Sequence, residues 1–151
     1  MKALPAALIA LSALSACSSD PYVDARPLHG IAAQDAVQMA AGSAPRGVMG
    51  VFKLHVRATG EQDGRLYLNS EEDYRDQRNV AIEIPPAAAK QLTEQLGADP
   101  LVALKDKDLL VAGVAQRVTI YFYDSDGRRT DKYYYQTHVR VYDPQQIVIR
   151  D

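Results

Sequence analysis

The sequence predicts a mostly β domain that follows an export signal. From Val48 onward, several segments alternate apolar and polar residues, which is typical of strands with one buried face. Clusters of Gly, Pro and Asp separate these segments, and only two stretches have helical spacing. The chain has 151 residues, enough for one domain with its own apolar core. We therefore expect five strands, a helix between the third and fourth, and a short helix before the first.

Residues 1–16 have the features of a secretory signal peptide. Lys2 precedes an almost wholly apolar stretch, residues 3–13. This stretch has about the length of a signal-peptide core and is shorter than the roughly 20 residues that cross a bilayer. We interpret it as an export signal rather than a membrane-spanning helix.

The sequence Leu14-Ser15-Ala16-Cys17 resembles the lipobox of bacterial lipoproteins. The resemblance implies cleavage after Ala16 and attachment of lipid to Cys17, the chain's single cysteine. Burial of each CH₂ of an acyl chain in the membrane contributes roughly 0.8 kcal/mol, so two or three acyl chains form a stable membrane anchor. Ser18 after the cysteine points, by the same resemblance, to the periplasmic face of the outer membrane. Residues 17–29, which include Pro21 and Pro27, are expected to form the lipidated cysteine and a tether.

The charge of the chain argues weakly against a general nucleic-acid binder. One of the 17 basic residues, Lys2, belongs to the signal, so the remaining chain carries 16 basic and 19 acidic side chains. Nucleic-acid-binding domains usually have a basic excess. A single cysteine allows no internal disulfide, so the domain must be stable through its core.

The expected domain comprises residues 30–151, with a short helix at about 31–41 and a barrel at about 48–150. Ala32, Ala36, Met39 and Ala40 share one face of the helix, and Gly42 is a plausible stop. In the first strand, Phe52, Leu54 and Val56 are expected to face the core. A turn at 59–64 then leads to a second strand at 65–69, and a third strand occupies 80–84, which completes a meander.

The second half of the domain begins with a helix at 87–96, closed by Gly97. Two long strands follow, at 109–123 and 132–142, joined by a turn at 124–127, and a short piece at 146–149 ends the domain. Gly113 marks a point where the first long strand can bend. Alternation predicts that Val118, Ile120 and Phe122 face the core.

This element order is that of the OB-fold, a five-stranded Greek-key barrel with a helix between strands three and four. The sequence also resembles small exported bacterial OB-fold domains over roughly residues 48–150. The resemblance lies in residues 64–76 (GRLYLNSEEDYRD), 110–114 (LVAGV) and 143–149 (DPQQIVI). These motifs imply a fold and carry no catalytic chemistry.

Two surfaces are candidates for binding. The first is basic and would suit an anion or a phosphate backbone: Lys53, His55, Arg57, Arg65, Tyr67, Arg128 and Arg129. The second is rich in tyrosine and would suit a protein: Tyr121, Tyr123, Tyr134 and His138. A solvated sheet face is the simpler interpretation of the first surface, and cross-strand aromatic pairing that stiffens the hairpin is an equal alternative for the second.

No motif predicts catalysis, a cofactor or a metal site. The histidines do not have the spacing of a zinc motif such as His-Glu-x-x-His. The Asp124-Ser125-Asp126-Gly127 turn lacks the remaining ligands of a calcium loop. We therefore expect a non-enzymatic envelope lipoprotein that binds an envelope protein. Binding of nucleic acid or another anionic polymer is the alternative.

Overall fold

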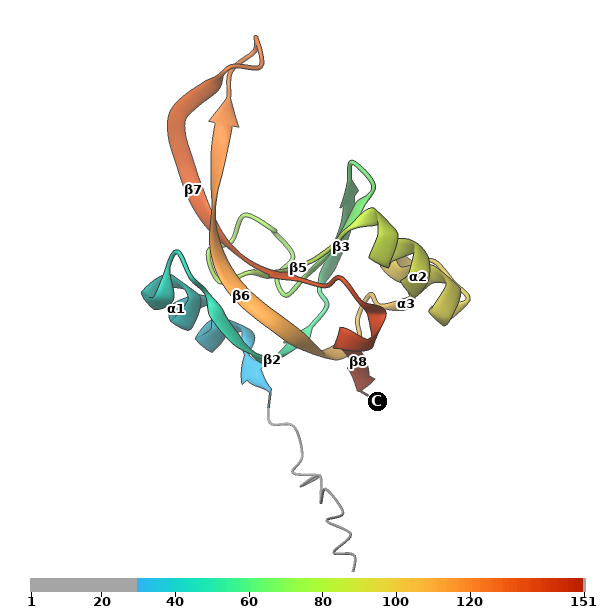
Figure 1. Ribbon diagram of the computed structural model, residues 1–151. Helices are drawn as coiled ribbons and strands as arrows, with labels where there is room; N and C mark the ends of the chain where they lie inside the picture. The colour runs from blue at the N-terminus through green and yellow to red at the C-terminus, as the bar shows by residue number, and fades with distance from the viewer. Residues whose placement is uncertain (1–29, 151) are drawn as a thin grey trace, which may run out of the picture.

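The structure is a computed structural model, and it describes residues 30–150 (Figure 1). The predicted signal peptide, Cys17 and the tether lie outside these residues. Within the described part, no helix is long and apolar enough to span a bilayer.

The domain is mostly β, as predicted, and its strands form one mixed sheet. The strands are β1 (Ile31–Ala32), β2 (Val48–His55), β3 (Ala58–Gln62), β4 (Arg65–Asn69), β5 (Val80–Ile84), β6 (Asp108–Tyr123), β7 (Arg129–Arg140) and β8 (Ile147–Arg150). The helices are α1 (Ala33–Ser43), α2 (Pro86–Leu96), α3 (Pro100–Ala103) and a 3-10 turn, η1 (Pro144–Gln146). The sheet order is β1-β2-β6-β7-β5-β4-β3, and β8 pairs with β6.

The sheet has eight strands in residues 30–150, where the sequence predicted five. Two of the additional strands, β1 and β8, are short and pair with β2 and β6. The third additional strand, β3, arises because the backbone changes its hydrogen-bonding partner between Val56 and Arg57. Val56 donates its backbone N–H to Lys107, beside β6, whereas Arg57 donates to Asn69, at the end of β4. The chain therefore leaves β2 and continues as a separate strand, β3, in the segment where the sequence predicted a turn.

The predicted turn at 59–64 is too broad, because residues 59–62 belong to strand β3. The turn consists of Asp63 and Gly64, whose φ angles are both positive, at 52° and 72°. Two residues with left-handed backbone make the tight hairpin turn that matches the twist of paired strands. Strands β3, β4 and β5 therefore form the antiparallel meander, and β5 then pairs in parallel with β7.

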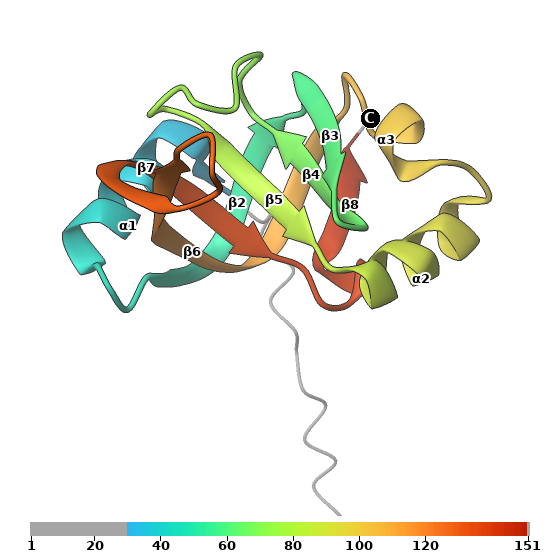
Figure 2. The ribbon, with the colours of Figure 1, turned by 90° about the horizontal axis from the view of Figure 1, so that it is seen from above.

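The buried side chains form one core, to which α1 and α2 contribute from opposite ends of the sheet (Figure 2). Phe52, Leu54 and Val56 are buried as predicted, and so is Leu68, which is 0% exposed. All five residues of β5 are buried. Helix α2 ends where predicted, with Gly97 in the left-handed conformation at its C-cap.

Helix α1 differs in detail from the prediction. Ala36 and Ala40 are buried, but Met39 is 42% exposed, so the apolar face is narrower than expected. Ile31 belongs to β1, and the helix continues through Gly42 to Ser43.

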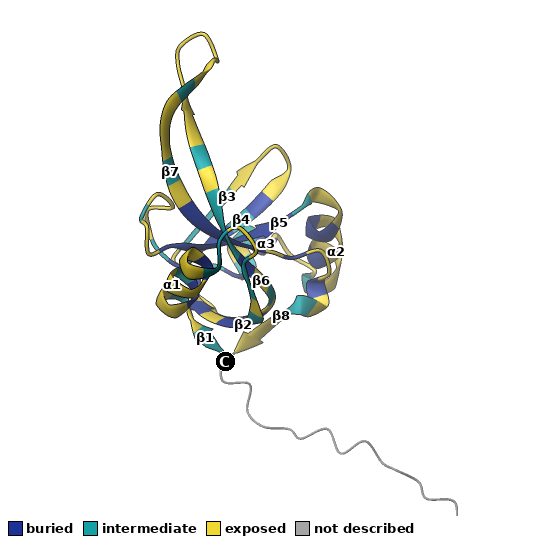
Figure 3. Ribbon diagram, turned by 60° about the vertical axis from the view of Figure 1, so that its left-hand side comes forward, coloured by how far each residue is buried: buried dark blue, intermediate teal, exposed yellow. Residues whose placement is uncertain are grey.

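A hairpin arm, formed by the distal parts of β6 and β7 at residues 116–136, projects from the body of the domain (Figure 1). Its surface is largely exposed (Figure 3). The predicted burial of Phe122 is wrong: its side chain is 48% exposed, while Val118 and Ile120 are partly buried. Pairing of β2 with β6 stops at Ala115, and pairing of β5 with β7 stops at Thr137. Beyond these points no core lies beneath the arm.

Candidate functional site

The sheet face opposite the core carries a row of polar side chains across β4, β5 and β7. Tyr67 is paired with Glu83, and Glu83 with Arg140. Strand alternation turns these side chains away from the core, which is lined by their neighbours Leu68, Ile82 and Val139.

Glu83 is the centre of a charged cluster on this face. It is only 7% exposed although it lies on the outer side of the sheet. The Nε of Arg140 donates to Oε2 at 3.0 Å, and the Nε of Arg65 lies 3.5 Å from Oε1. Burial alone would raise the pKa of Glu83, but the hydrogen bonds from His138 and Arg140 outweigh it and hold the pKa below its ordinary value. Glu83 is therefore an ionised carboxylate that orients two guanidinium groups.

His138 is part of this cluster and is not the exposed surface residue that the sequence predicted. It is 9% exposed, with Nδ1 3.2 Å from Oε2 of Glu83 and Nε2 2.7 Å from Oε1 of Gln136. Burial lowers the pKa of His138, and the hydrogen bond to Glu83 offsets only part of that effect. The ring also packs edge-on against Tyr67, with 6.2 Å between the centroids.

A groove of about 520 Å³ adjoins the cluster and lies between β3–β4 and the root of the arm. Its lining comprises Ala58, Thr59, Gly60, Glu61, Gln62, Tyr67, Asn69, Glu72, Tyr74, Ala81, Ile120, Tyr134, Gln136 and His138. Burial raises the pKa of Tyr67 and of Tyr134, so both hydroxyls stay protonated well above neutral pH. Gln136 donates to the hydroxyl of Tyr134 at 3.0 Å and to the backbone oxygen of Tyr74 at 3.3 Å, which ties the loop before β5 to β7.

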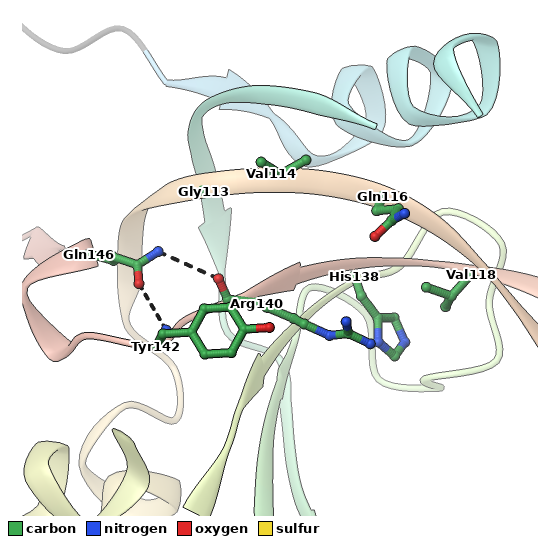
Figure 4. Close-up of a pocket in the computed structure, with 8 residues that line it drawn as sticks. All are labelled: Gly113, Val114, Gln116, Val118, His138, Arg140, Tyr142 and Gln146. Carbon is green, nitrogen blue, oxygen red and sulfur yellow. Dashed lines mark hydrogen bonds between the residues drawn. The ribbon is translucent and has the colours of Figure 1, made fainter. Parts of the chain in front are cut away.

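A smaller hollow of about 270 Å³ lies on the other side of His138, between β6 and the end of β7 (Figure 4). The side chains of Arg140 and His138 lie next to each other here, and Gln146 reaches across from the 3-10 turn. Gln146 donates to the backbone oxygen of Ala112 at 2.7 Å and accepts from the N–H of Tyr142 at 2.8 Å. The hydrogen bonds of Gln146 serve to fasten the C-terminal segment to the sheet.

The arm carries aromatic side chains on both faces. On one face Tyr121, Tyr133 and Tyr135 form a ladder, with centroid distances of 6.0 Å and 5.5 Å between successive rings. Two guanidinium groups extend it: Arg129 lies 4.5 Å over Tyr121, and Arg117 lies 4.4 Å over Tyr135. We call these five residues the tyrosine ladder.

The predicted tyrosine surface is divided between the two faces of the arm. The cross-strand partner of Tyr121 is Tyr133, so Tyr134 points to the opposite face, where it packs on Phe122 at 5.5 Å. Tyr121 and Tyr123 are exposed as predicted, whereas Tyr134 is partly buried beside the groove. A shift of one residue in register exchanges the faces of a strand, and alternation along single strands did not supply that register.

The predicted basic surface is also not continuous. Lys53 and His55 lie on β2, whereas Arg65 and Tyr67 lie on β4, and three strands separate β2 from β4 in the sheet. Arg57 follows β2. The last two members, Arg128 and Arg129, lie at the tip of the arm and at the start of β7.

Carboxylates accompany several members of this basic set. His55 is 3.1 Å from Asp108, Arg65 is held by Glu83, and Arg128 is 3.2 Å from Asp126. The turn around Asp124 is closed by hydrogen bonds from the backbone of Asp126 and Arg128 to the Asp124 carboxylate. Among residues 30–150, no group of three or more His, Cys, Asp and Glu is close enough to hold a metal ion.

The Glu83 cluster and the groove were not predicted as a site. One signal was available, because Glu83 is the single charged residue in the otherwise apolar segment Val80–Ile84. The sequence matches no protein-family model, and no curated protein is significantly similar to it.

Proposed function

We propose that this chain is a lipid-anchored protein of the bacterial cell envelope whose OB-fold domain binds another envelope protein through the hairpin arm. The lipobox-like segment ending at Cys17 supports the anchor. The exposed tyrosine ladder supports the binding surface.

The strand connections are consistent with an OB barrel. Strands β2 and β3 together correspond to its first strand, and β4, β5, β6 and β7 to the remaining four. Helix α2 follows the third of these and precedes the fourth. The parallel pairing of β5 with β7 and the antiparallel pairing of β2 with β6 are the long-range links that such a barrel uses. Strands β1 and β8 are additions to it.

The observation that carries the binding proposal is the arm itself. Tyr121, Tyr133 and Tyr135 are exposed together on one face, although they are large and partly apolar. Their mutual packing and the two arginines fix their rotamers before any partner arrives, which reduces the entropy lost on binding. Tyrosine and arginine are the residue types that most often dominate protein interfaces.

Crosslinking and capture from membranes with the anchored protein tests this proposal. Tyr121→Ser combined with Tyr133→Ser should abolish partner recovery, because anchor residues of an interface contribute about 2 kcal/mol or more each. Met49→Ser combined with Tyr142→Ser removes two exposed side chains outside the arm and should leave recovery unchanged. Equal recovery with both double variants would contradict the proposal.

Binding of an anionic polymer through the basic residues makes the opposite prediction. Lys53→Glu with Arg57→Glu would then abolish recovery, and added salt would weaken binding steeply. We expect neither effect, because the basic residues do not form one surface.

A further inference from the structure

The groove between β3–β4 and the arm has an acidic lining. Two of its fourteen lining residues are carboxylates, Glu61 and Glu72, and none is Lys or Arg. Both carboxylates are exposed, and neither forms an ion pair with another residue of the described range 30–150. Burial lowers the pKa of His138, the remaining basic group of the lining, and even its protonated form carries one charge against two carboxylates. The lining therefore has a net negative charge.

The arginines on the same sheet face do not cancel this charge inside the groove. Arg65 and Arg140 do not belong to its lining, and each directs its Nε to the carboxylate of Glu83. Glu83 therefore holds both guanidinium groups beside the groove.

Three tyrosine rings, those of Tyr67, Tyr74 and Tyr134, line the same groove. The face of an aromatic ring attracts a cation, and rings combined with carboxylates recognise ammonium and guanidinium groups. The ring of Tyr74 already has such a contact, because the guanidinium carbon of Arg75 lies 5.2 Å from its centroid. The rings of Tyr67 and Tyr134 remain for a cation of the partner. Ala58, Gly60 and Ala81, whose side chains are small, also line the groove.

The groove is continuous with the arm. Ile120 and Tyr134 belong to β6 and β7 and also line the groove, and Phe122 of the arm packs on Tyr134. A partner that extends from the tyrosine ladder around to the opposite face of the arm, that of Phe122 and Tyr134, therefore lies next to the groove.

We propose that the groove binds a lysine or arginine side chain of the partner protein. This inference rests on the proposed function, because it specifies the chemistry of the same partner. The Glu61 and Glu72 carboxylates supply the charge, and the tyrosine rings supply the enclosing faces.

Fluorescence polarisation with the full-length protein tests the groove without knowledge of the partner. The probes are three fluorescein-labelled pentapeptides that differ only at the central residue, which is arginine, lysine or citrulline. Citrulline has the shape of arginine and no charge. We expect the arginine and lysine peptides to bind at least about tenfold more tightly than the citrulline peptide. Equal affinity of all three would overturn the proposal, because charge would then play no part.

A matched pair of variants separates the groove from the overall charge of the protein. Glu61→Gln with Glu72→Gln should weaken binding of the arginine peptide by about tenfold or more. Asp35→Asn with Glu94→Gln removes two exposed carboxylates outside the lining and should change affinity less than about twofold. An equal loss in both double variants would show a diffuse electrostatic attraction and would overturn the groove assignment.

The peptide experiment can fail independently of the arm proposal. Tyr121→Ser with Tyr133→Ser should abolish capture of the partner and leave peptide affinity unchanged. Capture that depends on the arm, together with no charge-dependent peptide binding, would overturn the groove assignment alone. Charge-dependent peptide binding, together with capture that does not depend on the arm, would overturn the arm proposal alone.

Discussion

His138 and Glu83 face each other across the parallel strands β7 and β5, with Nδ1 of the imidazole 3.2 Å from Oε2 of the carboxylate. Both side chains lie on the sheet face opposite the core and are nevertheless buried, because Tyr67, Arg65 and Arg140 surround them. Burial lowers the pKa of His138, while the bonds from His138 and Arg140 lower the pKa of Glu83. The pair therefore couples the stability of the domain to pH.

Acidification should destabilise the domain in two steps. The lowered pKa of His138 means that the unfolded chain, whose imidazole titrates near 6.5, binds this proton more readily than the folded one. Stability should therefore fall as the pH drops below about 6.5. The lowered pKa of Glu83 adds a second loss as the pH falls below the ordinary value of 4.5. Urea midpoints measured between pH 8 and pH 3 would show both steps.

A histidine substitution identifies the source of the first step. His138→Gln should flatten the dependence of the urea midpoint on pH between about pH 7 and pH 5. The wild-type protein, measured in the same buffers, gives the reference slope. An unchanged slope in the His138 variant would show that its protonation does not control stability.

Leu68 and Phe122 were both predicted to face the core, but truncation to alanine should change the free energy of unfolding much more at Leu68 than at Phe122. Leu68→Ala removes a fully buried side chain and should lower the free energy of unfolding by about 2–5 kcal/mol. Phe122→Ala removes a half-exposed side chain from the arm and should cost about 1 kcal/mol or less. Chemical denaturation measures both. A large loss for Phe122→Ala would mean that the arm folds back onto the domain.

Two strand glycines provide a second matched pair. A Cβ at Gly113 would lie 2.8 Å from Cγ1 of Val139, whereas a Cβ at Gly60 would meet nothing within 4 Å. Gly113→Ala should therefore lower the free energy of unfolding by about 1–3 kcal/mol through overpacking. Gly60→Ala should leave stability unchanged or raise it by about 0.5 kcal/mol, because it restricts the unfolded chain. Equal stability of the two variants would contradict the close approach of β6 and β7 at Gly113.

The lipid anchor makes a prediction that does not depend on the fold. Cys17→Ser should leave the precursor uncleaved and unlabelled by radioactive palmitate, because the thiol that accepts the lipid is absent. Wild-type protein expressed in parallel provides the reference for cleavage and labelling. Normal palmitate labelling of the Cys17→Ser variant would contradict lipid attachment at Cys17.

Much of the fold could be predicted because it depends on local periodicity. Phe52, Leu54 and Val56 alternate with polar residues, and in a strand a period of two places the three apolar side chains on one face. Helix α2 was recognisable from its apolar spacing and from Gly97, which ends it in a left-handed conformation. The turn at Asp63 and Gly64 was placed too broadly, because the polar residues of β3 do not alternate with apolar ones.

The sequence by itself determined where β2, β4, β5, β6 and β7 lie, because residue patterns and turn signals within a few residues mark these segments. Strands β1 and β3 lack such a pattern and were not predicted. Only the tertiary structure decided what each face meets. Phe122 continues the alternation of Val118 and Ile120 and is still exposed, because the pairing of β2 with β6 and the core beneath it end near Ala115. Glu83 meets Arg140 from 57 residues away, and Tyr121 meets Tyr133 rather than Tyr134. Strand register and sheet order bring such residues together, and both depend on hydrogen bonds between segments that are distant in the chain.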